Sequence, residues 1–210
     1  MIQTIANNTA FLLAAEPAHG GHAPAAIGQG PAWALLIPLL PLLASGLCGV
    51  CAALKVKSKA PALMAVVSLA ISLAMAVPGW VQSDETGAID ETRDWIQFHW
   101  GDGPGQALLA NFSLYIDSLT MLWMLFVTGL GALIALYASE YMEHDLGQGY
   151  NRFFAYFALF VFAMSCLVMG DNLLMLFLGW EGVGLCSYLL IGYFYKKPSA
   201  VAAAKKAFIV

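Results

Sequence analysis

The sequence predicts an all-α protein, a polytopic transmembrane helix bundle with five spans and the start of a sixth. Of its 210 residues, 60% are hydrophobic and only 10% are charged, whereas soluble chains average roughly 45–50% and about 25%. Long stretches without Asp, Glu, Lys or Arg recur along the chain, and a helix needs roughly 20 mostly apolar residues to cross the hydrocarbon layer. The nine basic residues form no clustered patch, so nucleic acid is excluded as a partner.

Five stretches have the length and composition of membrane spans. The turn-forming residues Gly170, Asp171 and Asn172 separate the last two of them, so these two spans should form a tight hairpin rather than one long helix. A short apolar stretch at 207–210 looks like the first turn of a sixth span. The five predicted spans are 33–54, 60–83, 118–139, 153–170 and 172–195.

The basic residues indicate how the bundle lies in the membrane. Eight of the nine follow the first, third and fifth spans, and only Arg93 lies on the other side, in an acidic loop at 82–106. Basic loop residues are retained on the cytoplasmic side. The sequence therefore predicts an amino terminus outside the cell, and the same count supports five spans, because merging the last two would move four lysines to the wrong face.

The regions before and between the first spans carry weaker signals. Residues 1–31, rich in Ala, Gly and Pro, are predicted to form a flexible exterior arm, where His19 and His22 lack further ligands for a metal. Residues 32–139 hold three introductory spans and the exterior loop 82–106, whose aromatic residues favour the membrane surface. The four cysteines lie in apolar surroundings and are expected to be buried and unpaired.

One acid stands out because apolar surroundings make it costly. Glu181 lies about 2.5 residues, or roughly 4 Å, from the middle of the fifth span, where an acid costs about 2.5–3.5 kcal/mol to insert. Two explanations are open: a group that loads and releases a proton, or a static hydrogen-bonding residue that ties helices together. Buried carboxylates in membranes usually mark ion pathways, which favours the first.

The surroundings of Glu181 favour an interior position. Gly179, Gly182 and Gly184 let another helix approach closely or leave room for water, and Tyr188 lies seven residues further on the same face. No cation lies deep in the first four spans, so a counter-charge must come from beyond Val210, from another subunit or from water.

Polar residues near the ends of the spans have alternative explanations. Asp117 and Asp171 lie at the predicted outer face, where capping and turn formation compete with an exit for ions. Lys205 and Lys206 either anchor the cytoplasmic side or feed protons toward Glu181. The sequence contains no phosphate-binding loop, hydrolytic triad or metal-ligand spacing, which leaves movement of a small charge as the predicted chemistry.

Several motifs resemble the largest antiporter-like membrane subunit of respiratory complex I, the proton-pumping NADH:quinone oxidoreductase. The resemblance extends over 114–210 and is most specific around Glu181. It rests on Tyr115-Ile116-Asp117-Ser118-Leu119, on Gly170-Asp171-Asn172-Leu173-Leu174, on Gly179-Trp180-Glu181-Gly182-Val183-Gly184 and on Ala203-Ala204-Lys205-Lys206-Ala207-Phe208.

The resemblance implies a fold and a role. It implies that residues 140–210 begin the first of two inverted repeats, a device that transporters use for ion sites at the membrane midplane. Glu181 would be the proton switch, pairing with a lysine that is not in this sequence; Lys206 would lie on the input side and Tyr188 would line the path. The chain would then be part of a longer subunit.

The partners follow from the same resemblance. No cofactor is expected in this chain, because flavin, iron–sulfur clusters and quinone would lie in other subunits of complex I. The partners would be those membrane subunits, especially a neighbouring antiporter-like subunit, and the lipid bilayer, with the bacterial plasma (inner) membrane favoured over the mitochondrial inner membrane. Two alternatives remain: the large subunit of a multi-subunit sodium/proton antiporter, and a structural membrane scaffold.

Overall fold

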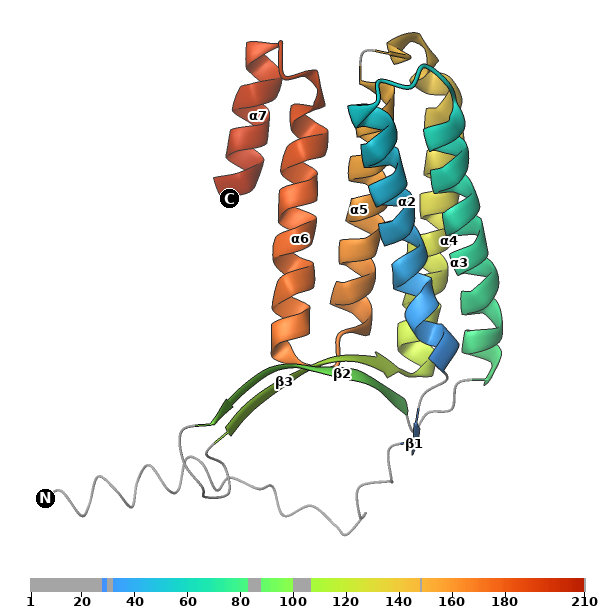
Figure 1. Cartoon of the computed structure of the whole chain (residues 1–210), viewed down its shortest axis with the longest axis vertical. Coiled ribbons are helices and arrows are strands. Elements are labelled where there is room, and N and C mark those ends of the chain that lie inside the picture. Colours follow the sequence, from blue (N-terminus) through green and yellow to red (C-terminus); the bar gives the residue numbers. More distant parts are fainter. Residues whose placement is uncertain (1–27, 30–31, 83–87, 100–106, 148, 210) are drawn as a thin grey trace, which may run out of the picture.

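The computed structural model describes residues 28–29, 32–82, 88–99, 107–147 and 149–209, and it is built mainly of long helices that stand side by side (Figure 1). The predicted helical bundle is confirmed, and the chain is a multi-pass membrane protein. Five helical segments are long and apolar enough to cross a membrane: Trp33–Ala53, Ala60–Gln82, Ser118–Tyr141, Tyr150–Met169 and Leu173–Phe194. Most of the predicted arm, with His19 and His22, lies outside the described residues.

Helices α2 (Leu36–Ala53) and α3 (Ala60–Gln82) form the first antiparallel pair, and a 3-10 turn, η1 (Ala32–Leu35), leads into α2. The chain turns sharply after α2, because Lys55 has a φ of 53° that reverses its direction. Buried hydroxyl groups join the helices: Ser72 donates to the carbonyl of Ile37 at 3.0 Å. The buried Ser72 hydroxyl thus keeps a partner in the apolar interior.

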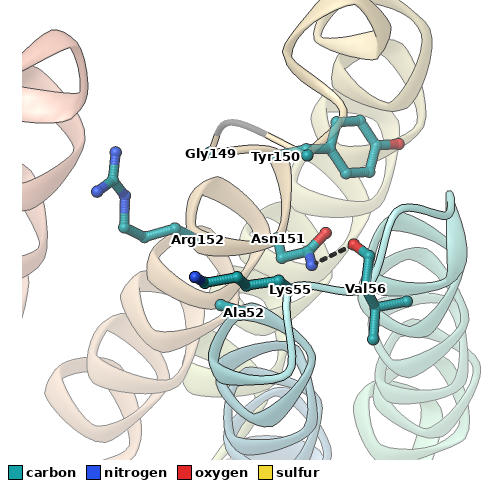
Figure 2. Close-up of a pocket in the computed structure, with 8 residues that line it drawn as sticks. Ala52, Lys55, Val56, Gly149, Tyr150, Asn151 and Arg152 are labelled. Atoms are coloured by element: carbon teal, nitrogen blue, oxygen red, sulfur yellow. Dashed lines mark hydrogen bonds between the residues drawn. The ribbon is translucent and has the colours of Figure 1, made fainter.

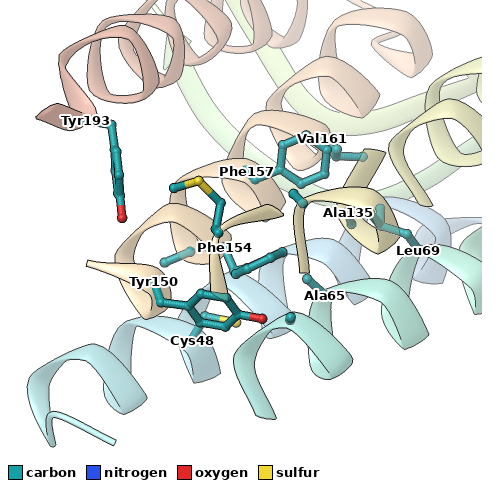
Figure 3. Close-up of a cluster of buried hydrophobic side chains, with 13 residues drawn as sticks. Cys48, Ala65, Leu69, Ala135, Tyr150, Phe154, Phe157, Val161 and Tyr193 are labelled. Carbon is teal, nitrogen blue, oxygen red and sulfur yellow. The ribbon is translucent and has the colours of Figure 1, made fainter. Parts of the chain in front are cut away.

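Helix α4 (Ser118–Tyr141) leads through the short 3-10 turn η2 (Glu143–Asp145) into α5 (Tyr150–Met169). The four helices α2 to α5 enclose an apolar cluster around Tyr150, Phe154 and Leu69, each fully buried. Figure 3 shows these side chains filling the space between the helices, with Tyr193 at the edge of the cluster. This bundle has its own packed core.

The region between α3 and α4 contains strands rather than a loop. β2 (Ala88–His99) pairs with β3 (Ala107–Ile116) in an antiparallel hairpin, and β1 (Gly28–Gln29) adds a short parallel strand to β2. Residues 88–99 of the connection that the sequence predicts at 82–106 therefore form a strand. The hairpin lies across one end of the bundle, opposite the α2–α3 turn (Figure 1).

Strand β3 forms hydrogen bonds with the turn between α5 and α6 (Leu173–Ile191). Leu114 forms a bridge with Gly170, and the Ser113 hydroxyl donates to a carboxylate oxygen of Asp171 at 3.0 Å. The amide of Asp171 also donates to the carbonyl of Ser113 at 3.4 Å. The predicted tight hairpin at Gly170 is confirmed, and the strand holds it in place.

The last part of the chain turns back beside α6. A 3-10 turn, η3 (Gly192–Phe194), follows α6, and α7 (Pro198–Ile209) runs antiparallel to it. Helix α7 begins at Pro198 rather than at 207, where the sequence indicated the start of a sixth span. Proline is favoured at the first position of a helix, because its missing amide donor would have no partner there in any case.

Candidate functional site

Glu181 lies near the middle of the fifth span, as the sequence predicts. The span Leu173–Phe194 begins at a well-formed cap, because the Asn172 side chain accepts from the amide of Met175 at 2.9 Å. Glu181 is about 2.5 residues from the midpoint of that span, or roughly 4 Å along the axis. The helix therefore places a carboxyl group far from both ends of the span.

The Glu181 side chain is exposed, on a face of α6 that the described residues do not cover. Helix α6 packs against α5 on one side and against the shorter α7 on another. Its buried residues are Met175, Gly179 and Cys186, and none of the hydrogen bonds or ion pairs formed within the described part of the chain involves Glu181. The structure thus leaves the acid open to a neighbour or to water.

The glycines around Glu181 divide into two kinds. A Cβ at Gly179 would lie 2.5 Å from the Leu167 amide nitrogen, and one at Gly182 would lie 2.9 Å from the Cβ of Ala163. These two glycines let α5 and α6 approach closely, which confirms that part of the prediction. Gly184 has nothing within 4 Å of such a Cβ, so its surroundings are open like those of Glu181.

Tyr188 lies on the α7 side of the helix. Its ring packs edge-on against Phe208 at a centroid distance of 5.5 Å. It also lines a cavity of about 240 Å³ between α5, α6 and α7, together with Arg152 and Tyr156. The cavity places Tyr188 near the polar ends of Arg152 and Tyr156, but Glu181 is not among its lining residues.

Lys206 is exposed on α7 and does not lie level with Glu181. A Cβ at Gly192 would lie 3.3 Å from Ala204, and together with the Tyr188–Phe208 contact this sets one antiparallel register. Lys206 is then level with residue 190 of α6, about 13 Å along the axis from Glu181. Lys205 is exposed as well. The structure does not bring either lysine to the acid.

Asp117 and Asp171 lie at the hairpin end of the bundle, and both have structural partners. Asp117 caps α4, accepting from the amide of Thr120 at 2.6 Å, and Asp171 accepts from Ser113. These contacts account for both acids through capping and turn formation, the first of the two explanations that the sequence left open.

The opposite end of α6 has a polar cluster that sequence reasoning missed. The Tyr193 hydroxyl donates to Asp145 at 3.2 Å, and the Arg152 guanidinium lies over the rings of Tyr193 and Tyr195 at 5.7 and 5.0 Å. The residues come from three separate segments, namely η2, α5 and the η3 turn with the residue after it, so no local spacing in the sequence predicts the cluster. The cluster fixes the end of α6 against the start of α5.

The described residues offer no cluster of three or more His, Cys, Asp or Glu side chains that could hold a metal ion. The four cysteines are unpaired, and three of them, Cys48, Cys166 and Cys186, are buried.

Two family models match the chain. One describes the N-terminus of chain 5 of NADH-Ubiquinone oxidoreductase (complex I) and matches residues 104–154. The other describes the transmembrane part of the NADH:quinone oxidoreductase/Mrp antiporter family and matches residues 170–210, which include Glu181. The chain belongs to the complex I and Mrp antiporter family. The recognised resemblance is thereby confirmed.

Relatives within this family are similar over parts of the chain, and each of the following is named NADH-quinone oxidoreductase subunit L. The protein of Escherichia coli (strain K12) is 56% identical over 100 residues, which make up 48% of this chain and 16% of the relative. The Pseudomonas aeruginosa protein is 47% identical over 141 residues, 67% of this chain and 22% of the relative. The Rickettsia typhi protein is 37% identical over 178 residues, 84% of this chain and 26% of the relative. The chain thus spans about a quarter or less of the length of these relatives.

Proposed function

We propose that this chain is part of a membrane subunit of NADH:quinone oxidoreductase that moves protons across the membrane. The observation that carries the proposal is Glu181, an acid at the middle of a membrane span on a face that the described residues leave open. Similarity to proteins named subunit L supports the assignment to that enzyme. The chain would translocate protons, and electron transfer would occur in other subunits.

The position of Glu181 suits proton transfer better than a static link between helices. A linking residue would have a partner in the helices already present, yet α5 and α7 offer it none within the described residues. An acid facing lipid at this depth is costly, so the open face is expected to meet protein or water in the assembled subunit. Burial favours the protonated form of a carboxyl group and a nearby cation favours the ionised form. A cation that approached Glu181 would therefore make it release its proton, and withdrawal of the cation would let it take up another.

Tyr188 and Lys206 are proposed to act on the input side of this switch. The cavity that Tyr188 lines extends to Arg152, at the basic end of the bundle, and it offers room for water between α5, α6 and α7. Lys206 lies roughly level with this cavity, about 13 Å along the helix axis from Glu181. It would supply protons through intervening water rather than by direct contact.

The orientation, location and partners are part of the same proposal. Lysines and arginine at the α2–α3, α4–α5 and α6–α7 turns favour a cytoplasmic position for that end, with the amino terminus and the β-hairpin outside. We place the subunit in a bacterial inner membrane, beside a neighbouring antiporter-like subunit of the complex and surrounded by lipid. Flavin, iron–sulfur clusters and quinone would be bound by other subunits.

The substitution Glu181→Gln tests the proposal, because it keeps the shape of the side chain and removes its proton. In the intact membrane complex we expect proton pumping to fall by about a hundredfold, the lower end of what a positioned proton-transfer group contributes, with quinone-linked NADH oxidation falling as well. Pumping is measured in inverted membrane vesicles with a pH-sensitive dye, and subunit content by immunoblotting.

The control is Glu140→Gln, which removes the same charge at the end of α4. Glu140 lies 3.1 Å from Lys59, which keeps a second partner in Glu143, so this variant should pump normally. Normal pumping by Glu181→Gln, at normal subunit content, would refute the role of the acid.

Sodium/proton exchange is the second candidate, because the family description that matches 170–210 also covers Mrp antiporters. In that case the acid would exchange protons for sodium without any redox partner. Sodium-driven proton movement that persists when NADH oxidation is blocked, and that disappears in Glu181→Gln, would favour this alternative. A structural scaffold would tolerate Glu181→Ala with full turnover.

A further inference from the structure

A cavity of about 230 Å³ lies at the basic end of the bundle, where the end of α2 meets the start of α5 (Figure 2). Lys55 from the α2–α3 turn and Arg152 from α5 line it, together with Gly149, Tyr150 and Asn151. The space equals that of roughly eight liquid water molecules. Its position at the ends of two spans places it at the level of lipid headgroups.

The cavity is positively charged. Neither Lys55 nor Arg152 belongs to the ion pairs formed among described residues, which all involve Lys59. Helix α5 is 20 residues long and begins at Tyr150, and the residue before it, Gly149, provides no side-chain cap, so the first amide groups of α5 and the positive end of its dipole point toward this region. Two cations beside an uncapped helix start favour an anion.

Asn151 gives a second and independent indication of a ligand. Only 7% of this residue is exposed, and its amide nitrogen donates to the carbonyls of Cys51 and Val56 at 3.0 and 2.8 Å. These bonds hold the turn that carries Lys55 against α5. The amide oxygen has no donor within the described part of the chain. A buried acceptor of this kind calls for a donor.

We propose that this cavity binds the headgroup of an anionic phospholipid that carries a hydroxyl group, as phosphatidylglycerol does. Its phosphate would accept from Lys55, Arg152 and the first amides of α5, and its glycerol hydroxyl would donate to the Asn151 oxygen after a small adjustment of that side chain. A choline headgroup offers neither a net negative charge nor a donor. The site does not depend on the proton role of Glu181.

The test measures lipid binding to the intact, purified membrane complex. The probes are phosphatidylglycerol, phosphatidylcholine, phosphatidylmethanol and inorganic phosphate, and retained lipid is counted by native mass spectrometry after titration in detergent. Lys55→Gln and Arg152→Gln should each weaken phosphatidylglycerol binding about fivefold, and the double variant about 25-fold, as expected for cations that attract anionic lipid. Lys196→Gln removes a charge at the same end outside the cavity and should leave this binding unchanged.

Each probe separates one part of the proposal. Phosphatidylmethanol has the same charge but no headgroup hydroxyl, so it should bind about threefold to tenfold more weakly than phosphatidylglycerol, as loss of one hydrogen bond predicts. Equal binding of the two would overturn the assigned role of Asn151. Unchanged phosphatidylglycerol binding by the double variant, or equal competition by inorganic phosphate, would overturn the lipid site. Subunit content of each variant shows that the complex has assembled.

Discussion

The α2–α5 bundle and the α6–α7 pair are built from similar apolar helices, yet they are covered to different degrees. Between 33% and 50% of each membrane span in the bundle is buried inside the structure, against 17% of the span that contains α6. The bundle encloses its own apolar cluster, whereas α6 rests on α5 along one face and presents Glu181 on another. The difference indicates that the bundle packs around a core of its own and that most of the α6 surface has no packing partner within the described residues.

The largest expected effect comes from the covered side of α6. In Gly179→Ala the added Cβ would lie 2.5 and 2.7 Å from the backbone nitrogen and Cα of Leu167, and a backbone cannot move aside cheaply. We expect the free energy of unfolding to fall by about 3 kcal/mol, the upper end of the usual cost of overpacking. Reversible unfolding in mixed detergent micelles measures this change.

Gly184→Ala is the matched control on the same helix. Nothing lies within 4 Å of the added carbon, so the chain should be unaffected or stabilised by up to about 1 kcal/mol through helix propensity. Equal losses in the two variants would contradict the difference between the faces. If Gly184→Ala instead blocks assembly of the whole complex, a segment packs closely on the open face.

A smaller effect is expected from the cap of α6. Asn172→Ala removes the acceptor for the Met175 amide and a hydrogen bond to the Ser113 hydroxyl. We expect the free energy of unfolding to fall by about 1–2 kcal/mol. Asp117→Ala removes the corresponding cap of α4 at a similar cost. Amide hydrogen exchange distinguishes them: the first should speed exchange in α6 alone, and the second in the bundle. Identical exchange patterns would show that the two regions unfold as one unit.

The smallest effect concerns the surface of the bundle and its pH dependence. Hydrogen bonds with Glu143 and then Glu140 raise the pKa of Lys59 above its ordinary value. A raised pKa means that the charged lysine stabilises the folded state below its unfolded pKa of about 10.4, and that this contribution disappears as the pH rises through the folded pKa. The wild type should therefore exceed Lys59→Gln slightly in melting temperature at pH 8. The two should converge as the pH rises through the raised pKa of Lys59, and a constant difference would argue against the ion pairs.

The spans were predictable because charge is expensive in lipid, so the spacing of charges fixes where helices leave the membrane. The β-hairpin was not predictable in the same way. Strand β2 contains Asp90, Glu91, Arg93 and Asp94, which resemble a solvated loop, and register shifts between Glu91 and Arg93 and between Asp94 and Ile96 interrupt the alternation of a regular strand.

The candidate site was predictable only where one residue carries the signal. Glu181 is a single acid in a long apolar run, and its depth follows from counting. The Tyr193–Asp145 bond and the position of Arg152 join distant segments, and only tertiary packing brings them together. The separation of Lys206 from Glu181 likewise depends on the register between α6 and α7, which sequence alone does not set.

The strand that bridges Leu114 to Gly170 ties one end of α6, and the Tyr193 hydroxyl bonded to Asp145 ties the other. A helix held at both ends can bend or twist slightly, but a rigid-body rotation of it would break these contacts. A change in the protonation of Glu181 is therefore expected to act through side chains, water and adjacent segments that move relative to a stationary α6.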